Sequence, residues 1–151
     1  MIQRIQSIWL LLATIVLILM LFLPIATNVG GKESVVYIKG MQQSFSGDGL
    51  LVKTNIPMLL TGIVITLICF VNIFNFKRRS LQKKIIVFTI AAIIGFAFWC
   101  SIYLKQLPTG TEGASFGVGA YMPALAILFL VLAIFGINKD ERLIRSAERL
   151  R

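Results

Sequence analysis

The sequence contains no histidine and only six acidic residues among its 151 positions. Histidine is the commonest general base and the commonest metal ligand. The acids Glu33, Asp48 and Glu112 form no paired motif of the kind that acid–base catalysis uses. The cysteines, Cys69 and Cys100, fall about 13 Å apart in depth at 1.5 Å per helical residue, which is too far for a disulfide. We therefore predict a non-enzymatic chain with no catalytic residue, no metal site and no cofactor.

Charge is also missing from four long apolar segments, at about residues 5–23, 56–76, 85–104 and 116–137. The chain is 58% hydrophobic and 14% charged, with a mean hydropathy of +0.89, whereas soluble domains are near half apolar and a quarter charged. Each segment approaches the length of about 20 helical residues that crosses a bilayer. The sequence predicts an all-α membrane protein, one four-transmembrane-helix domain over residues 1–151.

The first apolar segment has a second interpretation, a cleaved signal peptide with Arg4 as its basic n-region. Its apolar core is long for that class, and "LPIATNVGG" offers no clean small-x-small cleavage site. An uncleaved span is the favoured prediction.

The basic residues are distributed unevenly between the two sides of such a bundle. If the segments cross alternately, one side holds only Lys32, Lys39, Lys53 and Lys105 of the fifteen Lys and Arg residues. By the positive-inside rule that side is periplasmic, so loop 24–55 is periplasmic, while loop 77–84, tail 138–151 and both termini are cytoplasmic. Charge placed between apolar blocks favours the lipid bilayer over nucleic acid as the partner. The candidate lipid- or partner-contacting residues are Lys77, Arg78, Arg79, Lys83, Lys84, Arg142, Arg145, Arg149 and Arg151.

The two outer connections differ in pattern. Within loop 24–55, "SVVYIK" and "GLLVK" are strand-like and flank a polar stretch with "SGDG", which favours a small β-hairpin over an irregular tether. The glycine-rich "GTEGASFGVG" lacks the Lys-Ser/Thr pair of a phosphate-binding loop, so we interpret it as a flexible approach to the fourth segment.

A few polar and small residues interrupt the apolar segments. Asn72 and Asn75 either form a polar lining near the cytoplasmic mouth, or they make hydrogen bonds between helices or contact the inner headgroups. Small residues spaced four apart, such as Ala97 with Ser101, indicate close helix packing or a face for another protein.

The C-terminal "INKDERLIRSAERLR" predicts a short amphipathic helix. Leu143, Ile144, Ala147 and Leu150 fall on one face, and Asn138 with Glu141 has the spacing of a capping box. Such a helix lies on the inner membrane surface, with its arginines near anionic lipid, or docks on a cytoplasmic partner.

Three stretches, "MIQRIQSIWLLLA", "FKRRSLQ" and the C-terminal segment, resemble a family of small four-helix membrane proteins from Bacteroidetes, domain of unknown function 4293. The resemblance covers the whole chain and implies a multi-pass protein of a Gram-negative inner membrane. It implies no activity and no functional residue.

The leading hypothesis for function is a non-enzymatic accessory or scaffold subunit of a membrane protein complex. One alternative is a passive carrier or pore for a lipid or small apolar solute. A second is a lipid-modifying intramembrane enzyme using Glu33, Asp48 or Glu112, for which their spacing gives no support.

Overall fold

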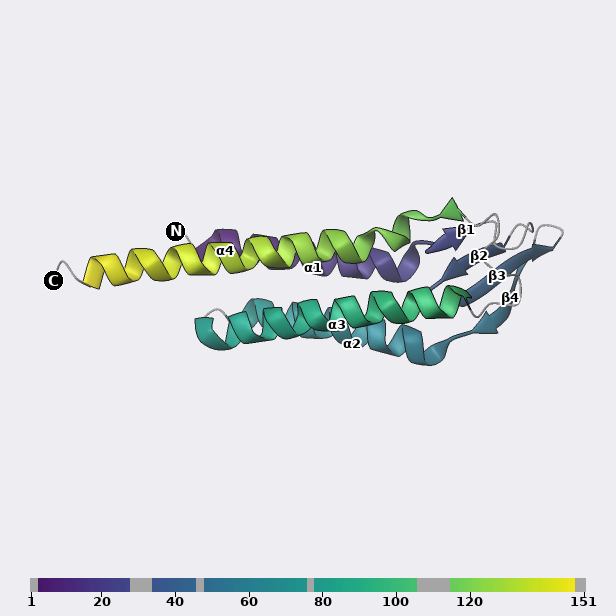
Figure 1. The fold of residues 1–151 in the computed structure, drawn as a ribbon, viewed down its shortest axis with the longest axis horizontal. Coiled ribbons are helices and arrows are strands. Elements are labelled where there is room, and N and C mark those ends of the chain that lie inside the picture. The colour runs from purple at the N-terminus through teal and green to yellow at the C-terminus, as the bar shows by residue number, and fades with distance from the viewer. Residues whose placement is uncertain (1–2, 28–33, 46–47, 76–77, 106–114, 149–151) are drawn as a thin grey trace.

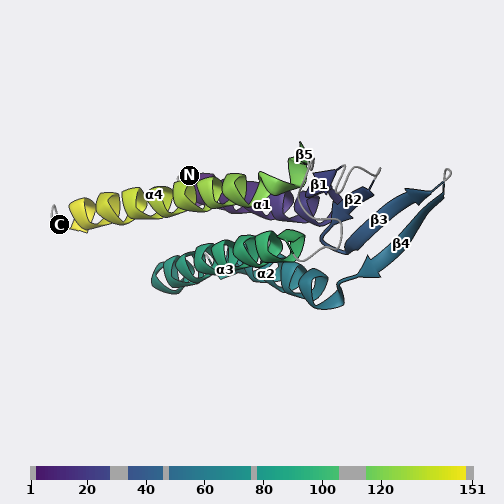
Figure 2. The ribbon, with the colours of Figure 1, turned by 45° about the vertical axis from the view of Figure 1, so that its right-hand side comes forward.

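The computed structural model describes residues 3–27, 34–45, 48–75, 78–105 and 115–148. Four helices run along the long axis: α1 (Gln3–Phe22), α2 (Ile56–Phe74), α3 (Arg79–Lys105) and α4 (Met122–Glu148) (Figure 1). The start of α1, the end of α4, the end of α2 and the start of α3 lie at one end of the bundle, which we call the charged end. A small sheet covers the other, the sheet end (Figures 1 and 2).

Three of the helices are long and apolar enough to cross a membrane, by length and composition: Ile56–Phe74, Arg79–Lys105 and the stretch Val118–Leu143. The first helix contributes a shorter apolar stretch, Gln6–Phe22. Proline marks two helix boundaries. Pro57 lies in the first turn of α2, where no intrahelical hydrogen bond is lost. Pro24 follows the last residues of α1.

Each helix buries one stripe with the spacing of a left-handed helix bundle. In α2 the stripe includes Met58, Ile65, Cys69 and Asn72, and α3 repeats the spacing from Gln82 to Cys100. The opposite faces stay apolar but uncovered within the part of the chain that the structure describes, as at Phe74, Phe88 and Phe98. An apolar exterior of this extent fits a lipid environment.

The sheet is five-stranded and antiparallel, in the order β4-β3-β2-β1-β5. Its strands are β1 (Ala26–Thr27), β2 (Ser34–Tyr37), β3 (Gly40–Phe45), β4 (Asp48–Thr54) and β5 (Ser115–Phe116). The strand predictions for "SVVYIK" and "GLLVK" are confirmed as β2 and β4, but the pairing differs. The stretch between them forms β3 and pairs with both, because the chain turns tightly between Tyr37 and Gly40, where Gly40 adopts φ 148°.

The prediction of a flexible approach to the fourth helix is wrong for residues 115–119, the part of that segment that the structure describes. Strand β5 pairs with β1, with Phe116 opposite Ala26, and a short 3-10 helix, η3 (Val118–Ala120), leads into α4. The Gly117 N–H donates to the Ile25 carbonyl at 2.8 Å, and the Gly119 N–H donates to the Pro24 carbonyl at 2.9 Å. These bonds tie the start of α4 to the end of α1.

The prediction of a separate C-terminal helix is wrong. Residues 138–148 continue α4 without a break, so Asn138 and Glu141 sit inside a helix and form no capping box. The reason is that the buried stripe Ala126, Leu130, Ala133 and Ile137 extends one more step to a buried residue in the tail, Asp140. Packing therefore holds the tail in line with the preceding span.

Candidate functional site

Lys83 joins α3 to α4 at the charged end. Its Nζ donates to Glu141 Oε2 at 2.7 Å and to Asn138 Oδ1 at 3.0 Å. The side chains of Lys83 and Glu141 are each 28% exposed, so the pair is partly shielded from water. Residues 138 and 141 are three apart on one helix and meet the same ammonium group. Lys83 is one of the basic residues predicted to contact lipid or a partner, and in the structure it bonds two residues of the same bundle.

Asp140 forms a second joint, between α4 and α1. The Gln6 Nε2 donates to Asp140 Oδ2, and both residues are 5% exposed. Sequence reasoning placed Asp140 in a solvated tail and missed its burial. The signal was present, because Asp140 continues the α4 stripe and Gln6 heads the α1 stripe of Leu10 and Leu17 at helical spacing.

Asn72 and Gln82 make the third joint, between α2 and α3. The Asn72 Nδ2 donates to the Gln82 carbonyl and the Gln82 Nε2 donates to the Asn72 carbonyl, each at 3.3 Å. Asn72 therefore bonds between helices, and it does not line an exposed mouth, since it is 1% exposed. Asn75 caps the end of α2 through a backbone bond to the Asn72 carbonyl. These three joints bring paired polar side chains together at the charged end.

Of the other basic residues predicted to contact lipid or a partner, some have side chains that the structure describes and the others do not. Arg78, Lys84 and Arg142 are exposed at the charged end, and Arg79 is half-buried there. Arg145 lies in α4 but its side chain is not among those described, and Lys77, Arg149 and Arg151 lie outside the described residues. Of the three acids considered for lipid chemistry, Glu33 and Glu112 lie outside the described residues, and only the backbone of Asp48 is described.

The last residues of α4 project past the ends of the other helices (Figure 1). We define the α4 arm as Arg142–Glu148, the residues of α4 that follow Glu141. At 1.5 Å per residue the arm is about 10 Å long. Arg142 is exposed and Leu143 is 46% exposed, so the arm presents both charge and apolar surface.

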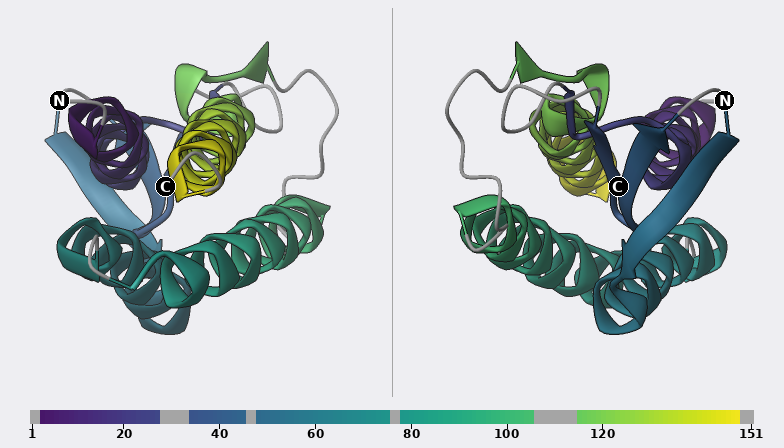
Figure 3. Two further views of the ribbon diagram at one scale, coloured as in Figure 1. Left: turned by 90° about the vertical axis from the view of Figure 1, so that its left-hand side faces the viewer. Right: turned by 90° about the vertical axis from the view of Figure 1, so that its right-hand side faces the viewer.

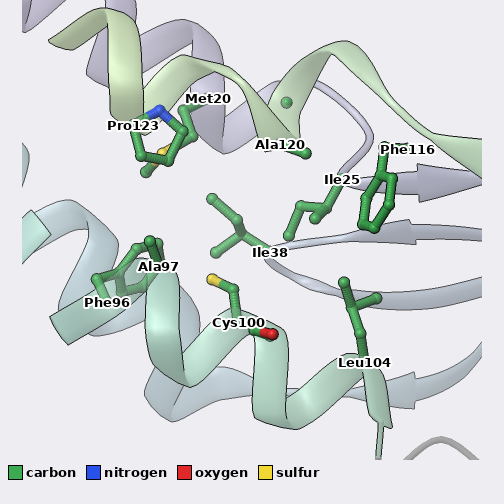
Figure 4. Close-up of a pocket in the computed structure, with 12 residues that line it drawn as sticks. Met20, Ile25, Ile38, Phe96, Ala97, Cys100, Leu104, Phe116, Ala120 and Pro123 are labelled. Carbon is green, nitrogen blue, oxygen red and sulfur yellow. The ribbon is translucent and has the colours of Figure 1, made fainter. Parts of the chain in front are cut away.

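A cavity of about 170 Å³ lies at the opposite end, beneath the sheet. Its walls come from α1, α3, the β1–β2 region and the η3–α4 junction (Figure 4). In Figure 4, Phe96, Cys100 and Leu104 of α3 face Met20, Ile25 and Pro123 across the space. Ile38, from the tight β2–β3 turn, lies between the two groups and is 0% exposed. None of the described lining residues is charged.

The small residues of α3 that were predicted to pack closely lie partly at this cavity. Ala97 and Ser101 line the cavity, as do Gly119 and Ala120 on the other side, so this small-residue pair does not bring two helices into close contact. Gly95 has no described neighbour within 4 Å of an added Cβ and lies on the outer face of α3.

The model of one protein family, Domain of unknown function (DUF4293), matches residues 2–150. The chain belongs to this family. Neither the curated proteins nor the solved structures gave a match. The family resemblance expected from the terminal and central motifs is thereby confirmed. Family membership assigns no residue a role, so the joints, the α4 arm and the cavity are the features from which a function has to be argued.

Proposed function

We propose that this member of the family is a four-span protein of a bacterial inner membrane, in Bacteroidetes, with the charged end cytoplasmic and the sheet end periplasmic. The exposed Arg78, Lys84 and Arg142 at the charged end support this orientation by the positive-inside rule. The packing of α1 supports an uncleaved first span, because Leu10, Ala13 and Leu17 are all 0% exposed in the core.

Within that membrane we propose that the chain is a non-enzymatic scaffold subunit that attaches to a protein partner through the α4 arm. The carrying observation is that α4 is unbroken and continues past the ends of the other helices as the arm (Figure 1). A helix that continues a span along its axis projects away from the membrane and does not lie in the interface. That geometry favours a cytoplasmic partner over the membrane surface as the contact of the tail.

The joints at the charged end support the same role. Gln6 with Asp140 and Lys83 with Glu141 fix the base of the arm to two different helices. A projection held at its base is preorganised, so a partner loses less conformational entropy on binding it.

The test is crosslinking of a tagged full-length chain in native membranes, followed by solubilisation and mass spectrometry. We expect a stoichiometric partner that is lost when residues 143–151 are deleted and weakened in Arg142→Glu. The matched control is Lys84→Glu, which makes the same charge change at the same end of the bundle but off the arm. Retention of the partner without the arm, or equal loss in the two point variants, contradicts attachment through the arm.

The cavity beneath the sheet favours a second candidate function, a carrier for a lipid or small apolar solute. Purification of the chain without a protein partner but with a bound apolar molecule is the outcome that distinguishes it from the scaffold.

A further inference from the structure

The wall of the cavity beneath the sheet has the chemistry of a hydrocarbon site. It is lined almost entirely by aliphatic, aromatic and small side chains, with the hydroxyl of Ser101 and the thiol of Cys100 as the polar side-chain groups among the described lining residues. Its volume of about 170 Å³ is close to that of the engineered apolar cavity of about 150 Å³ that stays dry and binds benzene. By that comparison it has room for roughly six carbon atoms of a chain.

The cavity exists because α3 and α4 separate toward the sheet end. They are joined at the charged end by Lys83, and Figure 3 shows α3 running away from the α1–α4 pair along its length. Small residues stand where large ones would close the space, at Ala97 on α3 and at Gly119 and Ala120 across it.

The space is connected to the surroundings of the bundle. Ser101 and Phe116 both line it and are both exposed, with Phe116 at 71%. A lining residue that is also exposed lies at the rim, so the opening falls between α3 and the β5–η3 segment. In a membrane-embedded bundle this rim faces lipid, and lipid chains are the apolar molecules at hand.

The surroundings of the rim indicate which kind of lipid. Trp99 and Tyr121 adjoin the lining residues Cys100 and Ala120 in the sequence and are 40% and 66% exposed. Such amphipathic rings favour the level of the lipid headgroups. Lys105, also exposed, is the last residue of α3 and directly follows the lining residue Leu104. A cation next to an apolar opening complements a molecule that is a hydrocarbon chain at one end and an anion at the other.

We propose that the cavity binds a segment of one acyl chain of an anionic phospholipid from the leaflet on the sheet side, with the headgroup phosphate near Lys105. The proposal rests on the membrane embedding inferred above and is independent of the scaffold role. An acyl chain that enters the cavity moves from the hydrocarbon of the bilayer to an apolar protein site, so it gains little from the hydrophobic effect. Preference among lipids must therefore come from the charge at Lys105 and from the fit of the chain.

The experiment uses the purified full chain in vesicles of phosphatidylcholine and phosphatidylglycerol. A trace of phosphatidylglycerol carries a photoreactive diazirine on its acyl chain, and peptides bearing adducts are identified by mass spectrometry after irradiation. We expect adducts to concentrate on peptides spanning 96–104 and 115–123. Ala97→Phe, which fills the cavity, abolishes this enrichment, whereas Ala91→Phe on the exposed face of the same helix leaves it unchanged.

A second variant guards against misfolding of Ala97→Phe. Ser101 is exposed at the rim, so Ser101→Phe obstructs the entrance without disturbing the core, and it too should abolish the enrichment. Adducts spread evenly over all outward helix faces, or equal labelling in Ala97→Phe, Ser101→Phe and Ala91→Phe, would overturn the proposal.

The charge preference is measured separately, by exchanging the photoreactive phosphatidylglycerol for the phosphatidylcholine analogue. Lys105→Gln should reduce the preference for the anionic lipid by about fivefold, the effect of about 1 kcal/mol per cation near a headgroup. Lys39→Gln is the matched control, because Lys39 is an exposed lysine at the same end, in the β2–β3 turn. If Lys105→Gln leaves the preference for the anionic lipid unchanged, the placement of the headgroup near Lys105 is overturned. The assay contains no other protein, so this result is independent of whether the chain is a scaffold subunit.

Discussion

Alanine at Gly117 or Gly119 tests whether the close approach of the η3 segment to the end of α1 holds the sheet end together. A Cβ added at Gly117 would lie 2.3 Å from the Pro24 carbonyl oxygen, and one at Gly119 would lie 2.7 Å from the same atom. Ordinary van der Waals contact begins at 3.4 Å, so the two segments must separate by roughly 1 Å. The obstacle is backbone and not a flexible side chain, so the segments have to move as units.

That movement lengthens the bonds that tie α4 to α1. The Gly117 N–H to Ile25 carbonyl bond and the Gly119 N–H to Pro24 carbonyl bond, 2.8 and 2.9 Å, both bridge the gap that must open. Each is worth about 1 kcal/mol net, and forcing an extra methyl into a packed site costs about 1–3 kcal/mol. We therefore expect each alanine variant to lower the free energy of unfolding by about 2–4 kcal/mol.

Two other glycines provide graded controls. Gly95→Ala meets no described atom within 4 Å and lies inside a helix, so its effect should be between zero and a stabilisation of about 1 kcal/mol. Gly62→Ala would meet Leu21 Cδ2 at 2.9 Å, a side-chain end that can rotate, so it should destabilise by about 1 kcal/mol.

The assay is reversible unfolding of the purified chain in mixed micelles, followed by far-ultraviolet circular dichroism against the denaturing detergent fraction. The expected order of stability is Gly95→Ala, then Gly62→Ala, then the Gly117 and Gly119 variants. If Gly117→Ala and Gly119→Ala unfold within about 0.5 kcal/mol of Gly95→Ala, the range of an ordinary surface change, the reasoning from the close approach is refuted.

Two further predictions concern the charged end. In a double-mutant cycle of Lys83→Met and Glu141→Gln, unfolding should reveal a coupling energy of about 1 kcal/mol. The reason is that the ion pair is 2.7 Å long and its two side chains are each only 28% exposed. A coupling energy near zero contradicts the role of this ion pair as a joint. In a cysteine-free background, Ser146→Cys should react with an impermeant thiol reagent only after the inner membrane is opened, whereas Lys39→Cys should react in intact cells. The reverse labelling pattern contradicts the proposed orientation.

The positions of the four long helices and of strands β2 and β4 followed from the sequence. Long uncharged runs and the strand-like composition of "SVVYIK" and "GLLVK" are local signals, and these helices and strands appear where those signals lie. Helix and strand formation depends on each segment's own composition and period, so a single chain suffices to predict it. The predicted boundary after residue 137 separated Asp140 from the stripe of buried residues that it continues.

Only the tertiary structure decided which segments meet. Strand β3 pairs with both of its neighbours although its "GMQQSF" is mostly polar, and β5 pairs with β1 across 88 positions of sequence. In the sequence Lys83 is not distinguished from the other basic residues, whereas in the structure Asn138 and Glu141 of α4 contact its ammonium group. The cavity depends on α3 and α4 separating at one end, which no local pattern encodes. These are long-range outcomes, set by how the helices and the sheet fit together, and a one-dimensional pattern does not carry that information.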